Sequence, residues 1–206
     1  MVAEGPIVPE ERRRQILEAA VRAFAAKGYH ACRVSDIATE AGVAYGLVYH
    51  YFGSKDALLQ AIFDETWGAM LDTISSVEQL DEPASDRVRK VTEIVLRTWK
   101  RDPDLVRLLV REVTRNQQLE RETDEIELAF DALQRIVEAG QESGEFRPDL
   151  DSRLAATIWY GALEEILTGW ALAQLPDSVD DVTRAERAVV EIVTGGLAVD
   201  RTAAPA

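Results

Sequence analysis

Apolar side chains recur at intervals of three and four residues along most of this chain, which is the spacing of amphipathic helices. We find no alternating strand pattern, internal repeat or long low-complexity tract. The sequence therefore predicts an all-α protein of nine helices. The expected helices are Pro9–Lys27, one capped by Ser35, Tyr45–Tyr51, one from its cap Ser54 to Val77, one after the loop Gln79–Ser85, one opened by Asp102-Pro103, Leu119–Glu142, Asp151–Gln174 and Val182–Val199.

The pattern also suggests how the chain divides. We expect residues 1–8 to be disordered, residues 9–53 to form a small amino-terminal domain of three helices, residues 54–199 to form a larger helical domain, and residues 200–206 to be a loose tail. At 47% hydrophobic residues the chain can bury a sizeable core.

The segment Val34–Lys55 has the pattern of a helix-turn-helix. Ala38 is small where two helices must cross closely, and Gly42 stands where the first helix must end in a left-handed residue. Ile37 and Val48 supply apolar contacts that hold the two helices at a fixed angle, so that the second can enter a DNA major groove. Such a pattern alone also occurs in small helical proteins that do not bind DNA.

Charge is distributed unevenly along the chain. The net charge of −14 at first argues against a nucleic-acid partner. Residues 1–63, however, contain seven basic and seven acidic side chains, so residues 64–206 carry all of the excess negative charge. A neutral amino-terminal domain on an acidic remainder fits a protein that presents one end to DNA, although acidic surfaces are also ordinary in bacterial proteins.

Other features restrict the class of protein. There is no run of 18 apolar residues, the length that predicts a membrane span, and the start lacks the apolar core of a secretion signal. Cys32 is the only cysteine, so no internal disulfide is possible and a reduced, cytoplasmic location near the nucleoid is expected. The two histidines and one cysteine have no metal-ligand spacing, and we find neither a phosphate-binding glycine loop nor a nucleophile signature. We expect no enzyme activity, no metal and no cofactor.

The residues that follow the helix-turn-helix sharpen the interpretation. Between Arg13 and Phe63 the chain resembles the amino-terminal domain of the TetR family of bacterial repressors. The resemblance rests on Ala23-Phe24, Gly28-Tyr29, Val34, Ile37-Ala38, Ala41-Gly42-Val43, Gly46, Tyr49-His50-Tyr51-Phe52 and Lys55. It implies the nine-helix TetR-like architecture, with a DNA-binding domain followed by a domain for ligand binding and dimerisation, and a double-stranded DNA operator as partner.

The resemblance also implies which residues contact DNA. We expect Tyr45 to contact a base edge, Tyr49 and His50 to reach phosphates, and Lys55 to hold a further phosphate. The other expected contacts are Arg33, Ser35, Ala44 and Gly46. Two positions depart from the family pattern, because Ala44 replaces a capping Ser or Thr and Leu47 replaces a Thr. Neither side chain can hydrogen-bond a phosphate, and Leu47 could instead contact a thymine methyl group or simply pack. The operator sequence therefore does not follow from the resemblance.

The predicted helix Asp151–Gln174 is apolar on more than one face, which implies packing partners on two sides. One partner is its own domain, and the other is expected to be a second copy of the chain, joined through this helix and the last one as a symmetric four-helix interface. The alternative is that the whole surface is intramolecular core. The expected interface residues are Leu154, Ile158, Ala162, Ile166, Val189, Ile192, Val193 and Leu197.

The family resemblance implies an effector pocket in the larger domain. Large aromatic residues are candidates for its walls, although such residues at helical spacing are usually core. The candidates are Trp67, Trp99, Leu108, Phe130, Trp159, Tyr160, Leu163 and Trp170.

A further resemblance, carried by residues 139–146, residues 149–155 and the stretch from Tyr160-Gly161 to Thr168-Gly169-Trp170, is to the fatty-acid-degradation regulators of this family. It implies a long-chain acyl-CoA effector that releases the protein from DNA. Arg107, Arg111 and Arg115 would then hold the CoA phosphates, or else form ion pairs with nearby glutamates. A different apolar ligand or drug, or a protein partner without any effector, remains an alternative.

Overall fold

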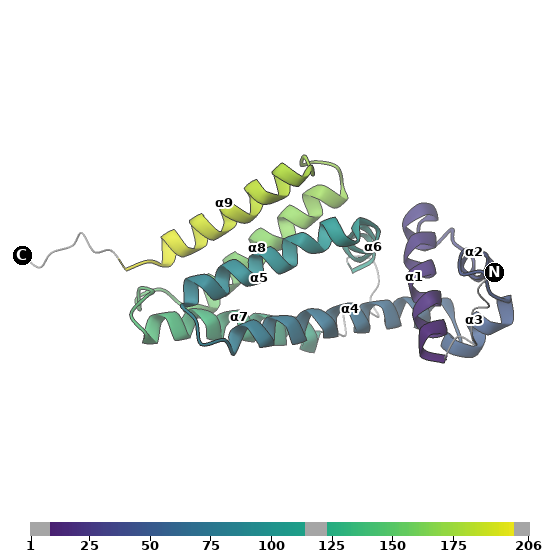
Figure 1. Cartoon of the computed structure of the whole chain (residues 1–206), viewed down its shortest axis with the longest axis horizontal. Helices are drawn as coiled ribbons and strands as arrows, with labels where there is room; N and C mark the ends of the chain where they lie inside the picture. Colours follow the sequence, from purple (N-terminus) through teal and green to yellow (C-terminus); the bar gives the residue numbers. More distant parts are fainter. Residues whose placement is uncertain (1–8, 114–122, 200–206) are drawn as a thin grey trace, which may run out of the picture. The chain divides into compact units, whose positions relative to one another are not determined.

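The computed structural model describes residues 9–113 and 123–199, and within these residues it contains nine helices and no strand (Figure 1). The predicted all-α class is confirmed. The helices are α1 (Pro9–Lys27), α2 (Val34–Glu40), α3 (Tyr45–Phe52), α4 (Lys55–Glu78), α5 (Ala84–Arg101), α6 (Pro103–Val113), α7 (Thr123–Glu142), α8 (Ser152–Ala171) and α9 (Val179–Leu197).

The described residues form two compact units. The first unit contains α1, α2, α3, the part of α4 up to Thr66, and α6 from Asp104; the second contains the rest of α4, α5, α7, α8 and α9. The sequence had suggested a boundary after residue 53, at the start of α4. The two units divide inside α4, after Thr66, and α6 from Asp104 groups with the first unit.

The first unit is built around the buried face of α1. Ile16, Ala20 and Phe24 lie at helical spacing and are buried, and α1 packs against α2. Gly28 follows α1 with a positive φ of 76°, and its N–H donates to the carbonyl oxygen of Phe24 at 2.8 Å, which ends the helix. Ser54 caps α4 as predicted, because its Oγ accepts a hydrogen bond from Ala57 N at 3.0 Å.

In the second unit α5, α8 and α9 lie side by side, and α7 packs along α8 (Figure 1). Two polar links cross this core. Trp159 Nε1 donates to Thr92 Oγ1 at 3.0 Å, with both side chains buried, and Arg97 forms a two-pronged ion pair with the buried Glu186 at 2.8 and 3.0 Å. Each link satisfies a buried polar group that would otherwise destabilise the fold.

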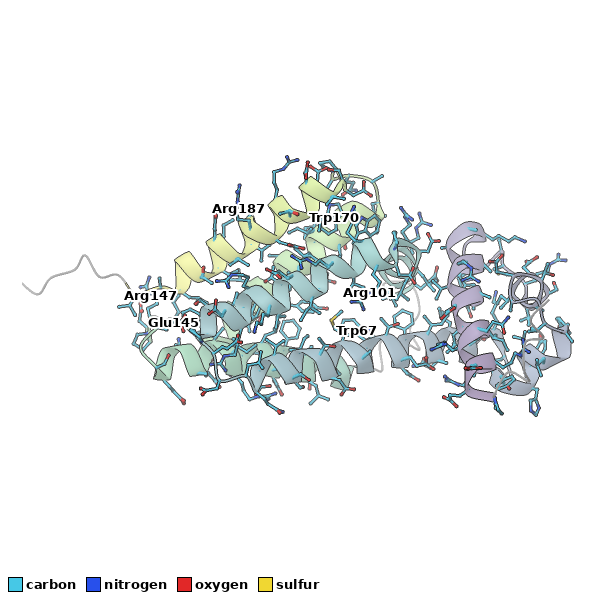
Figure 2. The ribbon with its side chains drawn as sticks, in the orientation of Figure 1. Trp67, Arg101, Glu145, Arg147, Trp170 and Arg187 are labelled. Atoms are coloured by element: carbon cyan, nitrogen blue, oxygen red, sulfur yellow. The ribbon has the colours of Figure 1, made fainter. Side chains whose placement is uncertain are left out.

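Side chains also fix the end of the second unit where Glu145 lies in Figure 2. The Glu145 carboxylate accepts hydrogen bonds from the backbone N–H groups of Ala84 and Ser85 at 2.7 and 3.0 Å, and so caps α5. A Cβ on Gly140 would come within 2.2 Å of the Phe146 ring, so only glycine allows this close packing.

The last two helices differ in extent from the sequence prediction. α8 ends at Ala171, three residues before the predicted end, because Gln174 N donates to Gly169 O at 2.7 Å and Ala173 adopts a left-handed φ of 55°. α9 begins at Val179, three residues before the predicted start, because Ser178 and Asp181 form a reciprocal capping box. The predicted start of the seventh helix at Leu119 lies outside the described residues.

Candidate nucleic-acid interface

The turn between α2 and α3 has the geometry that the helix-turn-helix pattern predicted. Gly42 has a positive φ of 64°, and the next residue, Val43, donates its N–H to Ala38 O at 2.9 Å. Ile37, Ala38 and Val48 are buried, and α2 packs against α3. The apolar contacts therefore fix the angle between the two helices and leave the opposite face of α3 accessible.

That accessible face of α3 carries most of the predicted DNA contacts. Tyr45 is 52% exposed and Tyr49 is 41% exposed, and Gly46 and His50 are exposed beside them. The Tyr45 and Tyr49 rings contact each other, with centroids 5.0 Å apart. Their hydroxyl oxygens are 3.1 Å apart, with Tyr45 donating, and this hydrogen bond raises the pKa of Tyr45.

The first turn of α3 lacks a side-chain cap. Ala44 occupies the N-cap position and makes no side-chain hydrogen bond to the helix, as expected for alanine where the family pattern has Ser or Thr. Ala44 is exposed and Leu47 is half-buried. Backbone N–H groups at such a helix start are suited to an anionic group such as a DNA phosphate.

The start of α2 corrects one detail of the sequence analysis. Ser35 was expected to cap α2, but the helix begins at Val34, so the N-cap residue is Arg33 and Ser35 is exposed in the first turn. The Asp36 carboxylate accepts a hydrogen bond from Arg33 N at 2.9 Å and pairs with Lys27 at 2.8 Å. The bond from Lys27, with that from the Arg33 backbone, lowers the pKa of Asp36. Arg33 is exposed, as a phosphate contact requires.

Lys55 has a role that the sequence analysis did not foresee. It was expected to hold a phosphate, but its Nζ donates to the carbonyl oxygens of Tyr29 and Cys32 at 2.9 and 3.2 Å and lies 4.4 Å from the centre of the Tyr29 ring. The Tyr29 hydroxyl donates to Asp56, and burial raises the pKa of Tyr29. Lys55 and Asp56 thus bind the loop after α1 to the first turn of α4. Gly28-Tyr29 and Lys55 all belong to the family motif, but no pattern in the sequence indicates that Lys55 contacts Tyr29.

The predicted pocket residues fall into two groups. Trp99, Trp159, Leu163 and Trp170 are buried in the core of the second unit, where Trp99 and Trp170 pack with ring centroids 6.1 Å apart and Trp170 Nε1 donates to Pro176 O at 3.0 Å. These four residues have the packing partners of ordinary core residues, which was the alternative interpretation.

The second group of predicted pocket residues is only half-buried. It comprises Trp67, Phe130 and Tyr160. The Phe130 and Tyr160 rings lie 4.5 Å apart, with the Arg153 guanidinium 5.2 Å from the Phe130 ring. Burial raises the pKa of Tyr160 to about 12, so its hydroxyl keeps its proton at neutral pH. These rings retain surface that a bound molecule can cover.

The predicted phosphate-binding arginines lie on or beyond α6. Arg107 forms an ion pair with Asp104 at 3.0 Å, which fits the alternative of a surface ion pair, and Arg111 is exposed. Leu108 is buried. Arg115 lies outside the described residues.

The residues predicted to form the dimer interface also differ in their exposure. Leu154, Ile158 and Ile192 are exposed, the last two at 69% and 73%, which is unusual for isoleucine. Ala162 and Ile166 are half-buried. The other three predicted interface residues, Val189, Val193 and Leu197, are buried in the single chain because α9 packs on α5 and α8. They belong to the chain's own core.

In the part of the chain that the structure describes, no three metal-ligating side chains come together. None of the described helices combines the length and apolarity needed to cross a bilayer.

Comparisons with known proteins agree with this geometry. Residues 16–62 match the family model for bacterial regulatory proteins of the tetR family, and residues 63–195 match that for the carboxy-terminal region of YsiA-like proteins. The Bacillus subtilis "Fatty acid metabolism regulator protein" is 30% identical over 89% of this chain and 94% of its own. The regulator TtgR of Pseudomonas putida is 31% identical over 83% of this chain and 84% of its own.

Among solved structures, the transcriptional regulator FadR of Bacillus subtilis in complex with stearoyl-CoA superposes with a TM-score of 0.78 at 28% identity, over 89% of this chain and 98% of the FadR chain. The family matches cover both the helix-turn-helix and the larger helical region, and members of this family are DNA-binding regulators and not enzymes. This chain belongs to the TetR family of bacterial transcriptional regulators.

Proposed function

We propose that two copies of this chain bind a near-palindromic operator as a repressor of fatty-acid metabolism genes, and that a long-chain acyl-CoA releases them. The observation that carries the effector assignment is the similarity, along 89% of this chain, to a regulator bound to stearoyl-CoA. The exposed face of α3 supports DNA binding through the major groove. Tyr45 would contact a base edge there, with Tyr49, His50 and Arg33 on phosphates.

A second copy of the chain is the proposed partner of α8 and α9. Their exposed apolar residues Leu154, Ile158 and Ile192 would be covered in a two-fold symmetric dimer. Such a dimer would present two α3 helices to half-sites roughly 34–36 Å apart, one turn of DNA.

Dimerisation is tested by introducing charge at the exposed positions. Ile158→Glu and Ile192→Glu should give a monomer by sedimentation and weaken operator binding, because a carboxylate cannot be buried unpaired in an apolar interface. Leu128→Glu is the matched control, since Leu128 is equally an exposed apolar residue of the second unit but lies on α7. A dimer that survives both isoleucine changes would contradict this interface.

The acyl chain would be bound by apolar residues of the second unit that are neither buried nor fully exposed. These residues are Trp67, Met70, Leu71, Ile94, Val95, Phe130, Tyr160, Ile166 and Leu167. Arg107 and Arg111 remain candidates for the CoA phosphates, with Arg107 exchanging Asp104 for a phosphate.

The effector would act by shifting a population between conformations. It must bind more tightly to a dimer whose α3 helices are wrongly spaced for DNA, and a coupling free energy of about 1–3 kcal/mol is typical of such linkage. α4 is suited to transmit the change, because one uninterrupted helix carries Lys55 in its first turn and Trp67 further along.

The test is operator affinity with and without saturating palmitoyl-CoA. We expect affinity to fall about 5- to 150-fold, whereas CoA alone and palmitate alone should have smaller effects because each lacks half of the proposed contacts. Unchanged affinity would reject the acyl-CoA assignment and leave the DNA-binding assignment standing.

A different apolar effector is the second candidate, because the half-buried Trp67, Phe130 and Tyr160 offer surface to any apolar molecule. Mass analysis of a molecule that co-purifies with the chain distinguishes the two. A preparation without any bound molecule, and an operator affinity that no apolar compound changes, would favour a protein partner instead.

A further inference from the structure

Tyr45 and Tyr49 are the only residues from Ala44 to Tyr49 whose side chains carry a hydrogen-bonding group, because the others are Ala44, Gly46, Leu47 and Val48. Both tyrosines are exposed on the face of α3 that is proposed to enter the groove. Hydrogen bonding by side chains in the first half of α3 therefore depends on two hydroxyl groups that contact each other at 3.1 Å.

Each tyrosine hydroxyl has a single hydrogen to donate and lone pairs with which to accept. A phosphate oxygen can only accept at neutral pH, so Tyr49 must use its hydrogen on the phosphate that it is proposed to contact. In the hydroxyl pair Tyr49 is then limited to accepting, and Tyr45 must donate to it. The 3.1 Å separation of the two hydroxyl oxygens allows this hydrogen bond.

The consequence for Tyr45 is that its only hydrogen is committed, and its oxygen presents lone pairs alone to the groove. The hydrogen-bond donors on base edges in the major groove are the N6 amino group of adenine and the N4 amino group of cytosine. The other polar base atoms in this groove, N7 and O6 of guanine, N7 of adenine and O4 of thymine, are acceptors and would oppose an accepting hydroxyl.

We propose that Tyr49 is a positioning residue that makes Tyr45 a hydrogen-bond acceptor, so that Tyr45 recognises an exocyclic amino group of adenine or cytosine in the operator. This inference rests on the proposed function, in which α3 reads the major groove and Tyr49 contacts a phosphate. Contact between the two rings, with centroids 5.0 Å apart, also reduces the side-chain freedom that Tyr45 loses on binding.

The first experiment locates the base pair. The full-length chain is used to select duplexes from a randomised library, and the selection is repeated with Tyr45→Phe, which keeps the ring and removes the hydroxyl. We expect the sequence preference to flatten at one position of each half-site. A preference that is identical for both proteins at every position would overturn the proposal, because Tyr45 would then read no base.

The second experiment removes single atoms from the base pair so located. Replacing adenine by purine, or cytosine by 2-pyrimidinone, deletes the amino group, and we expect it to weaken binding of the native chain about five- to tenfold, the effect of removing one hydrogen bond. A 7-deaza purine at the same pair deletes the N7 acceptor and should leave native binding unchanged. Tyr45→Phe should respond to neither deletion.

The role of Tyr49 is separated from a merely structural one by Tyr49→Phe. Without the Tyr49 hydroxyl, the Tyr45 hydrogen is released and can donate to a base acceptor, so the N7 deletion, which leaves native binding unchanged, should begin to weaken binding. The slope of log affinity against log salt concentration should stay unchanged, because the neutral Tyr49 hydroxyl displaces no counterion from the phosphate that it contacts. Tyr51→Phe, which removes a hydroxyl from the half-buried Tyr51 of the same helix, is the matched control and should behave as the native chain.

Failure of this inference is distinguishable from failure of the proposed function. If the chain selects an operator but native binding is insensitive to the amino deletion, the donor and acceptor assignment is wrong and the DNA-binding function stands. If the chain selects no sequence from the library, the proposed function fails and the inference fails with it.

Discussion

The two units differ in where the aromatic residues predicted to bind a partner lie. In the first unit Tyr45 and Tyr49 lie on the surface of α3, and small buried residues such as Ala38 hold the helices together. In the second unit Trp159 and Trp170 are buried, and each indole N–H has a hydrogen-bond partner inside the chain. A surface that reads DNA can be separate from the core behind it, whereas a pocket inside a helical bundle must share residues with the core.

This difference explains why sequence analysis performed unequally on the two units. In the first unit the spacing of Ala38, Gly42 and Val48 specified the turn and the buried wedge, so the exposed positions followed by helical periodicity. In the second unit the same periodicity marks Trp67 and Trp159 as apolar positions without telling a pocket wall from a packed core residue. Only the structure shows that Trp159 is fully buried and Trp67 is not.

Long-range pairings were also beyond the sequence. The ends of α1, α4 and α7 followed from Gly28, Ser54 and Ser143-Gly144, because these residues act on adjacent backbone. The contact of Lys55 with the carbonyl groups of Tyr29 and Cys32 joins residues 26 and 23 positions apart, and no local pattern predicts which distant carbonyl a lysine reaches.

The largest expected effect tests the contrast between buried and exposed aromatics. Trp159→Ala should lower the free energy of unfolding by about 4 kcal/mol, through the cavity it creates and the hydrogen bond that Thr92 can no longer make. Tyr45→Ala should leave the free energy of unfolding nearly unchanged, because Tyr45 is a surface residue. Urea unfolding followed by circular dichroism measures both, and similar losses would remove the contrast.

The next prediction concerns Lys55, which the family resemblance assigned to DNA and the structure assigns to the loop after α1. Lys55→Met should lower the free energy of unfolding by about 1–2 kcal/mol, because it removes a charged donor to two carbonyl groups. If Lys55 contacts no phosphate, the salt dependence of operator binding should be unchanged.

Arg33→Ala is the matched comparison for Lys55. Arg33 is exposed, so its removal should leave stability nearly unchanged and reduce the salt slope by about 0.9 for each phosphate that the side chain had neutralised. A reduced salt slope for Lys55→Met would restore its predicted role on DNA.

Alanine substitutions at two glycines of the helix-turn-helix distinguish the effect of backbone strain on stability from the effect of a surface methyl group on DNA binding. Gly42→Ala should destabilise the chain by about 1 kcal/mol, because Gly42 has a φ of 64° and alanine disfavours that conformation. Gly46→Ala should stabilise α3 by about 0.5 kcal/mol, since Gly46 is helical and nothing lies within 4 Å of a Cβ built there. It should nonetheless weaken operator binding, because the new methyl group stands on the face proposed to approach DNA.

Thermal unfolding and operator titration of both glycine variants check this pair of predictions. The informative result is that Gly46→Ala raises the stability of the chain while it lowers its affinity for the operator. If its affinity rises along with its stability, the exposed face of α3 does not approach DNA closely at this position.

The smallest expected effect is a dependence of stability on pH that belongs to the first unit. The hydrogen bond from Lys27 lowers the pKa of Asp36, so the folded state favours the charged carboxylate. A depressed folded pKa contributes stability above the unfolded value of about 3.9, and that stability is lost as pH falls through the lower, folded pKa. Asp36→Asn should therefore flatten the loss of stability below about pH 4 while slightly lowering stability at pH 7.

Lys27→Met should reproduce part of this flattening, because it removes the largest of the contributions that lower the Asp36 pKa. The double variant should be little different from Asp36→Asn alone, since two partners of one ion pair are not additive. The measurement is urea unfolding between pH 3 and pH 7. If Asp36→Asn leaves the steepness of the acid limb unchanged, neither the ion pair with Lys27 nor the hydrogen bond from Arg33 N to the Asp36 carboxylate stabilises the start of α2 in solution.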